Sequence, residues 1–185
     1  MRCCVRLWYV NNVLCVYIVI MTYKPTTPTW DCIFCKISAG AFPPLGNGLI
    51  YEDEKYMARL WPFPSTPWIT VVIPKAHFWS DVLHMPATDL QEFILVAKKI
   101  AKILEDYFPD VGRVGLIMEG TGIDHAHIKL YPMHGTWYMK KGEWRQVLCD
   151  QEYYTDIYPW YITSKEWPQA NFEELERVAW EIRSM

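Results

Sequence analysis

The stretch His125-Ala126-His127-Ile128-Lys129-Leu130-Tyr131 decides how this chain is interpreted. In an extended strand, alternate side chains point to the same face of the sheet. One face would therefore carry two imidazoles and an ammonium suited to phosphate chemistry, from His125, His127 and Lys129. The other face would carry small or branched apolar side chains that pack into a core, from Ala126, Ile128 and Leu130. The alternatives are a polar face in water, or two histidines hydrogen-bonded at a core edge.

The pair Cys32 and Cys35 has a two-residue gap that allows both thiolates to bind one tetrahedral zinc ion. Nitrogen ligands are available further along the chain, at His77, His84, His125 and His134. The pair also fits a redox dithiol or two small apolar residues. A segment rich in Gly and Pro follows at residues 40–48, where a redox motif would open a long amphipathic helix. Zinc binding and plain packing remain.

The rest of the central region predicts strands and one long helix. Strands are expected at residues 49–51, 56–61, 69–73, 113–118 and 125–131, with Pro and Gly clusters between them. Thr88 and Gln91 have the spacing of a capping box, and the helix should end by Pro109. Its apolar face would comprise Leu90, Phe93, Ile94, Ala97, Ile100, Ala101, Leu104 and Phe108.

Four sequence words in this order resemble the histidine triad (HIT) superfamily of nucleotide hydrolases and transferases. They are residues 31–37, 51–54 and 71–77, followed after the helix by the His-x-His strand, so the resemblance covers about residues 30–135. It implies an α+β fold, in which a five-stranded antiparallel sheet packs against the long helix. It also implies a homodimer.

The resemblance assigns roles to individual residues. His127 stands where the family has the nucleophile that attacks the α-phosphorus of a nucleotide and forms a nucleotidyl-histidine, and neutral imidazole suits that role. His125 would orient the site or bind zinc. In the zinc-containing branch of the family, the structural ligands correspond to Cys32, Cys35, His77 and His125. Dinucleoside polyphosphates are the leading substrate class, ahead of nucleoside phosphoramidates and sugar nucleotides.

Three positions depart from the family pattern. Lys129 replaces the third histidine of the triad; it can neutralise a phosphate oxygen but cannot accept a hydrogen bond while protonated. Ile69 stands where a further family histidine normally lies. Trp61 occupies the place of an aspartate that holds ribose hydroxyls, so we expect it to stack on a substrate base.

The loop before the His-x-His strand is shorter than in relatives. Gly120 and Gly122 would let backbone N–H groups approach a phosphate, and the Thr121 hydroxyl would donate to it. An ordinary tight turn is the alternative. Asp124 is expected to be a turn or edge residue.

Composition and the chain ends complete the expectations. The chain has 185 residues, a net charge of −3 and no basic run, so no nucleic-acid partner is expected. Its six cysteines fit thiols and metal ligands in a cytoplasmic protein. We expect an N-terminal extension at 1–22, a HIT-like domain at 23–135 and an aromatic-rich extension with a terminal helix at 136–185.

The N-terminal extension allows two interpretations. It contains an apolar run at residues 13–20, too short to span a bilayer and preceded by Asn11 and Asn12. We expect Met21 to be the natural start and no stable membrane association, with a weak anchor as the alternative.

The sequence thus predicts a hydrolase or nucleotidyl transferase that forms a covalent nucleotidyl-histidine. The alternative is a HIT-like protein that binds nucleotide, or holds structural zinc, without turnover. A hydrolase that activates water on zinc is disfavoured, because four protein ligands leave no open position on the metal.

Overall fold

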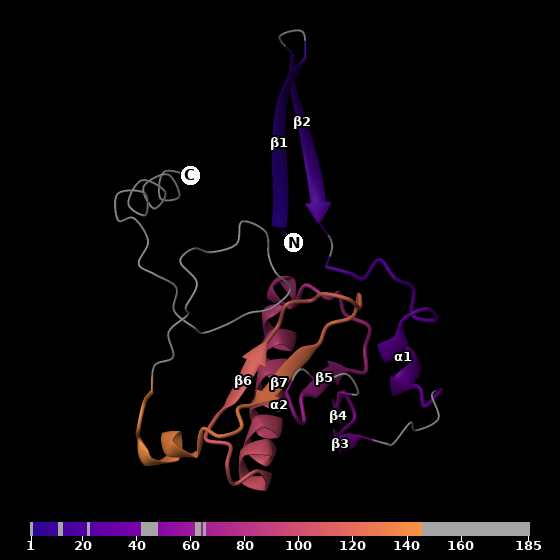
Figure 1. The fold of residues 1–185 in the computed structure, drawn as a ribbon. Coiled ribbons are helices and arrows are strands. Elements are labelled where there is room, and N and C mark those ends of the chain that lie inside the picture. Colours follow the sequence, from indigo (N-terminus) through magenta and orange to yellow (C-terminus); the bar gives the residue numbers. More distant parts are fainter. Residues whose placement is uncertain are drawn as a thin grey trace, which may run out of the picture. The chain divides into compact units, whose positions relative to one another are not determined.

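The computed structural model describes residues 2–10, 13–21, 23–41, 48–61, 64 and 66–145 (Figure 1). The chain divides into two compact units, residues 1–141 and residues 142–185. The first unit begins with a hairpin of two antiparallel strands, β1 (Arg2–Val10) and β2 (Val13–Met21). Among the described residues, no helix has the length and apolar character needed to cross a membrane.

A five-stranded antiparallel sheet carries the functional residues, in the order β3-β4-β5-β7-β6. Its strands are β3 (Leu49–Glu52), β4 (Tyr56–Leu60), β5 (Thr70–Pro74), β6 (Val114–Ile117) and β7 (Ile128–Pro132). All five lie within two or three residues of their predicted positions. The last differs in a way that matters: β7 begins at Ile128, so His125 and His127 precede the strand.

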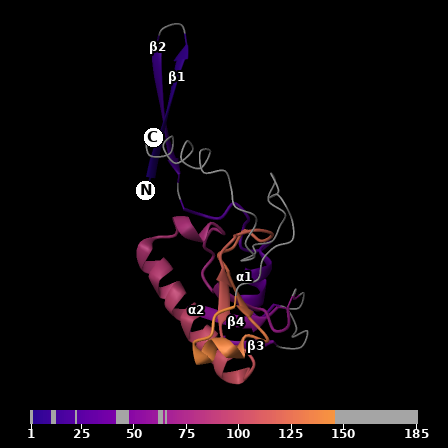
Figure 2. The same cartoon turned by 60° about the vertical axis from the view of Figure 1, so that its left-hand side comes forward.

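The long helix α2 (Ala87–Tyr107) packs against one face of this sheet (Figures 1 and 2). The predicted apolar face is confirmed: Phe93, Ala97 and Ile100 are fully buried, and the other predicted members lie in or against the same cluster. The capping box is wrong. The helix begins before it, at Ala87, with Pro86 as the N-cap and no side-chain cap bond. The carbonyl of Pro86 instead accepts the N–H of Leu90 at 2.9 Å.

Two apolar clusters cover the two faces of the sheet. The cluster beneath α2 includes Ala126, Ile128 and Leu130, as the alternating pattern predicted. The cluster on the opposite face joins Met57, Val71 and Ile73 to Cys32 and Phe34 from the segment that contains the short helix α1 (Ile33–Ser38). Figure 2 shows α1 and α2 on opposite sides of the strands. The face predicted to carry the histidines is therefore covered by protein.

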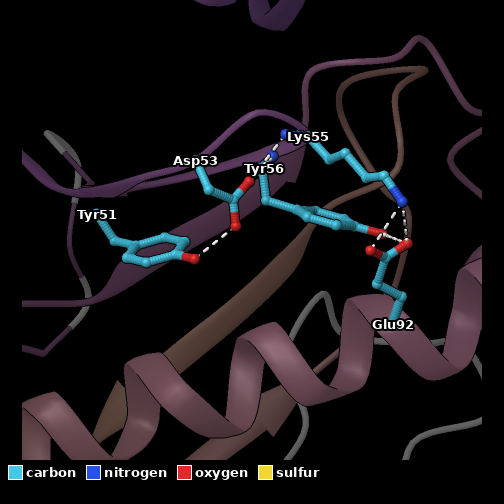
Figure 3. Close-up of polar contacts among 5 residues, drawn as sticks. All are labelled: Tyr51, Asp53, Lys55, Tyr56 and Glu92. Atoms are coloured by element: carbon cyan, nitrogen blue, oxygen red, sulfur yellow. Dashed lines mark hydrogen bonds and ion pairs between the residues drawn. The ribbon is translucent and has the colours of Figure 1, made fainter.

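The β3–β4 turn is fastened to itself and to α2 by polar contacts (Figure 3). Asp53 accepts hydrogen bonds from the backbone N–H groups of Lys55 at 2.8 Å and Tyr56 at 2.7 Å, and from the Tyr51 hydroxyl at 2.5 Å. Burial raises the pKa of Asp53, but these bonds outweigh it and hold the pKa below its usual range. Lys55 and the Tyr56 hydroxyl both donate to Glu92 on α2, at 2.9 and 3.4 Å.

Two short 3₁₀ helices complete the described elements, η1 (Val82–His84) and η2 (Trp137–Lys141). Three aromatic residues of the C-terminal extension are described: Trp137 and Trp144 are exposed, and Tyr138 is half-buried. The other aromatic residues of that extension, and the predicted terminal helix from Asn171, lie outside the described residues.

Candidate active site and metal centre

Four potential metal ligands converge from three separate segments. Cys32 and Cys35 lie at the start of α1, His77 follows β5, and His125 precedes β7. One ligand atom from each lies within 4.8 Å of the others. Nδ1 of His125 is 3.3 Å from the Cys32 sulfur and 3.5 Å from the Cys35 sulfur. Both cysteines are free thiols. These are the four residues that the family resemblance assigned to zinc.

Backbone carbonyls fix the orientation of both cluster histidines. Nε2 of His125 donates to the carbonyl of Pro74 at 2.8 Å, and Nε2 of His77 donates to the carbonyl of Asp124 at 2.8 Å. A carbonyl only accepts, so Nε2 carries the proton and Nδ1 keeps its lone pair. The two rings stack with centroids 4.9 Å apart. Burial lowers the pKa of His125 to about 4, so its imidazole is neutral at pH 7.

This donor set fits a tetrahedral zinc ion. Bonds of about 2.0–2.3 Å in a tetrahedron place neighbouring ligand atoms roughly 3.3–3.8 Å apart. The two sulfur–nitrogen distances, 3.3 and 3.5 Å, lie in that range. Histidines that bind zinc usually donate their other N–H to a carbonyl or carboxylate, as both do here. Burial raises the pKa of the Cys35 thiol to about 12, a cost that a bound cation reverses by stabilising the thiolate.

His127 is oriented by its neighbour in the motif. Its Nδ1 donates to the carbonyl of His125 at 2.8 Å, which leaves the lone pair on Nε2. Its ring lies edge-on to Phe34, with centroids 5.5 Å apart. Burial lowers the pKa of His127, so the ring is neutral at pH 7. His127 is 3% exposed, which excludes the alternative of a polar face in water at this position.

Lys129 forms an ion pair with Glu119, and the two side chains are 22% and 15% exposed. Lys129 lies in β7, and Glu119 follows the neighbouring strand β6. The registry explains the pairing, because Lys129 lies opposite Ile117, two residues before Glu119. The charge of Lys129 lowers the pKa of His127, and the charge of Glu119 raises it. The partner of Lys129 was missed in the sequence because strand pairing brings it there.

Both glycines of the loop before β7 have a positive φ. Gly120 and Gly122 have φ values of +65° and +83°, a region that glycine adopts without strain. A Cβ at position 120 would lie 2.6 Å from the carbonyl oxygen of Ser80, so only glycine fits there. Thr121 between them is half-buried. The loop joins the ion pair to the segment that carries His125.

Trp61 packs in the same cluster as Phe34, with ring centroids 6.3 Å apart in an edge-on arrangement. Phe34 therefore contacts Trp61, His125 and His127 at once. In the sequence, Phe34 was only one of the two residues between the cysteines. Its position beneath the histidines depends on how α1 covers the sheet, which no local pattern reveals.

The remaining histidines lie outside the cluster. His84 contacts the carboxylate of Asp81 at 2.6 Å, and His134 contacts that of Asp110 at 3.0 Å. Both were possible nitrogen ligands in the sequence. Among the described residues, the metal-ligand cluster includes His77 and His125 but neither His84 nor His134.

This arrangement, a His-x-His segment before strand β7 of a five-stranded sheet backed by one helix, defines a HIT-type fold. The HIT domain family matches residues 46–134. Protein hit of Bacillus subtilis is 32% identical over 109 residues, spanning 57% of this chain and 72% of that protein. An uncharacterized HIT-like protein of Methanocaldococcus jannaschii is 33% identical over 107 residues, spanning 56% of this chain and 79% of that protein. The chain belongs to the HIT family.

Solved structures agree with this assignment. The crystal structure of SMU.412c from Streptococcus mutans superimposes with a TM-score of 0.55 and 26% identity, over 83% of this chain and 84% of that one. A hypothetical histidine triad nucleotide-binding protein from Sulfolobus tokodaii gives a TM-score of 0.50 and 26% identity, over 83% of this chain and 90% of that one.

Proposed function

We propose that this chain is a nucleotide hydrolase or nucleotidyl transferase in which His127 attacks an α-phosphate. The observation that carries the proposal is the hydrogen bond of 2.8 Å from Nδ1 of His127 to the carbonyl of His125. It places the lone pair on Nε2, and burial keeps the ring unprotonated. The name of the Sulfolobus tokodaii relative, a nucleotide-binding protein, supports the choice of substrate class.

The proposed reaction has two displacements at phosphorus. Nε2 of His127 forms a bond to the α-phosphorus, and the bond from phosphorus to the leaving phosphate oxygen breaks with its electron pair. The Nδ1–H group stays hydrogen-bonded to the His125 carbonyl, which stabilises the positive charge on the modified ring. Water or another acceptor then attacks phosphorus from the opposite side. The nitrogen–phosphorus bond breaks, and neutral His127 is restored while the acceptor releases its proton to solvent.

Charged and backbone groups beside His127 fit the transition state. Lys129 would stabilise the developing negative charge on the phosphate oxygens, with its ammonium held by Glu119. The N–H groups of Gly120 and Gly122 and the hydroxyl of Thr121 would contribute hydrogen bonds to the same oxygens. His125 contributes its carbonyl to the orientation of His127, while both its ring nitrogens are engaged elsewhere.

Base recognition is assigned to Trp61. Its half-buried ring lies against Phe34, the residue that also contacts His127. An indole held this way offers a surface on which a base can stack. Dinucleoside polyphosphates are the proposed substrates, and a homodimer is the proposed assembly.

Cys32, Cys35, His77 and His125 would hold a structural zinc ion. Bound there, zinc would cross-link α1 to the segments that follow β5 and precede β7, and four protein ligands would leave it no open position for water. The metal would therefore fix the backbone of His125, whose carbonyl orients His127.

A second candidate is a nucleotide-binding protein without turnover. The 3% exposure of His127 favours it, because a substrate phosphate must approach the single ring edge that carries Nε2. The replacement of the third histidine by Lys129 points the same way. These two candidates differ in one measurable outcome, the formation of product.

The test is incubation of the purified protein with labelled diadenosine polyphosphate. We expect mononucleotide products from the wild type and their loss in His127→Ala, with activity kept in the control His84→Ala, since His84 pairs with Asp81, lies beside Trp79 and is not one of the four cluster residues. Tight binding without product in the wild type supports the second candidate. Equal activity of wild type and His127→Ala contradicts the proposed mechanism.

A further inference from the structure

Asp124 lies between the glycine loop and His125 and takes no part in the proposed reaction. We propose that it is a positioning residue that preassembles the metal-ligand cluster by joining the three segments that supply the ligands. This inference rests on the zinc site of the proposed function. Its carboxylate binds the segment that leads to the cysteines, its backbone carbonyl binds His77, and its own chain continues into His125.

The carboxylate holds the N-terminal segment 23–28. Oδ2 of Asp124 accepts the backbone N–H of Thr26 at 2.6 Å, the Thr26 hydroxyl at 2.7 Å and the N–H of Thr27 at 2.9 Å. These contacts join residues about a hundred positions apart in sequence. Hydrogen bonds to a charged acceptor are the stronger kind, so three on one oxygen define the position of the segment.

A short turn connects the N-terminal segment to the first of the two cysteines. The carbonyl of Pro28 accepts the N–H groups of Asp31 at 3.0 Å and Cys32 at 3.1 Å, which closes a turn between Thr27 and the first cysteine. Cys32 is buried, with its sulfur 3.3 Å from Nδ1 of His125. The carboxylate of Asp124 and the side chain of His125, which are neighbours in sequence, therefore hold the same segment at two points.

Asp124 also binds the segment that follows β5. The carbonyl of Asp124 accepts Nε2–H of His77 at 2.8 Å, which directs Nδ1 of His77 to the metal site. The N–H of Ser80 lies 3.5 Å from Oδ1 of Asp124. Tyr23 joins the N-terminal segment to the segment that follows β5, because its hydroxyl donates to the carbonyl of Trp79 at 2.7 Å.

Asp53 provides a matched control elsewhere in the chain. Like Oδ2 of Asp124, its carboxylate accepts two backbone N–H groups and one hydroxyl, from Lys55, Tyr56 and Tyr51. These contacts belong to the β3–β4 turn and involve none of the four cluster residues. Alanine at position 53 removes an equivalent set of hydrogen bonds. It therefore reproduces the loss of stability without the loss of ligand positioning.

The experiment measures zinc affinity by competition with a chromophoric chelator, and the near-ultraviolet thiolate-to-metal absorption of the Co²⁺-substituted protein. We expect Asp124→Ala to weaken zinc binding about 10- to 100-fold, the usual effect of removing an outer-shell partner, and to reduce the Co²⁺ band. Asp124→Asn keeps an acceptor oxygen without the charge, so it should fall between alanine and wild type. Asp53→Ala should bind zinc as the wild type does.

Each outcome bears on the inference. Zinc affinity of Asp124→Ala within twofold of wild type overturns it, as does an equal loss in Asp53→Ala. If Asp124→Ala does not fold, the comparison of Asp124→Asn with wild type decides in the same way. Wild-type protein that binds no zinc overturns the metal centre and this inference together. Zinc binding that depends on Cys32 but not on Asp124 overturns the inference alone.

Discussion

Replacement of Glu119 by Gln should weaken folding and strengthen nucleotide binding at the same time. The substitution keeps the size of the side chain but removes the carboxylate that pairs with Lys129. If Lys129 faces substrate phosphate, its charge is then no longer offset by a neighbouring anion. Stability should fall while nucleotide affinity rises. The ion pair stabilises the protein without ligand, but the Glu119 carboxylate weakens the attraction between Lys129 and a bound phosphate.

The exposure of the pair sets the magnitudes. Breaking a fully buried ion pair costs about 3–5 kcal/mol, whereas an exposed pair contributes roughly 0–1 kcal/mol. The Lys129 and Glu119 side chains are 22% and 15% exposed, so we expect a loss of about 1–3 kcal/mol in unfolding free energy. Two unit charges about 4 Å apart interact by about 4 kcal/mol at an effective dielectric constant of 20. If loss of the Glu119 charge strengthens the interaction between Lys129 and the substrate phosphate by a third of that energy, binding becomes about tenfold tighter.

Urea unfolding and isothermal titration with a non-hydrolysable nucleotide would measure the two effects. Glu92→Gln is the control, because it changes net charge equally but breaks an exposed pair with Lys55. It should lower stability much less than Glu119→Gln does and leave affinity unchanged. The gain in Glu119→Gln should shrink as salt is added. The variant Lys129→Met serves as a reference that lacks the ammonium. If Glu119→Gln binds nucleotide as weakly as Lys129→Met, the proposed role of the pair is wrong.

Three further predictions concern stability and are measured by urea unfolding. Gly120→Ala should cost about 2 kcal/mol or more, because a Cβ would lie 2.6 Å from the Ser80 carbonyl oxygen and φ is +65°. Gly122→Ala, with a positive φ but open space, should cost only about 1–2 kcal/mol, and equal losses would exclude the close contact as the cause. Asp53 has a lowered pKa in the folded protein, so its contribution exists above the unfolded pKa of about 3.9 and is lost as pH falls through the folded value. The difference in unfolding free energy between wild type and Asp53→Asn should therefore shrink below about pH 4; a difference that grows there would contradict this. Phe93→Ala should cost about 3–5 kcal/mol, because Phe93 is fully buried on the face of α2 that packs against the sheet, and a loss under 1 kcal/mol would show that the core is not packed as described.

The sheet and helix were predictable because their patterns are local. Alternation of apolar residues marked the strands, and the spacing from Leu90 to Leu104 marked the buried face of α2. The ends of the helices and strands were harder to predict. A backbone bend at His125 delays β7 until Ile128, and the helix starts at Ala87 without the capping box that the sequence suggested.

The candidate site was predictable in its residue types but not in its surroundings. The motif words placed the four cluster residues, which the fold brings within 4.8 Å. Burial of His127 was not foreseen, because Phe34 covers it from a segment more than ninety residues away. The ion pair of Lys129 with Glu119 depends on strand registry, and the contacts of Asp124 with Thr26 join distant segments. Nonlocal pairing of this kind leaves no periodic signal in one sequence.

The central claim is that Nε2 of His127 forms a bond to phosphorus. The most direct test is to quench the protein with labelled dinucleoside polyphosphate during turnover, digest it at alkaline pH and identify the modified peptide by mass spectrometry. We expect a mass increase of one nucleotidyl group on His127, absent in His127→Ala. Substrate conversion without any adduct, and with undiminished rate in His127→Ala, would contradict it.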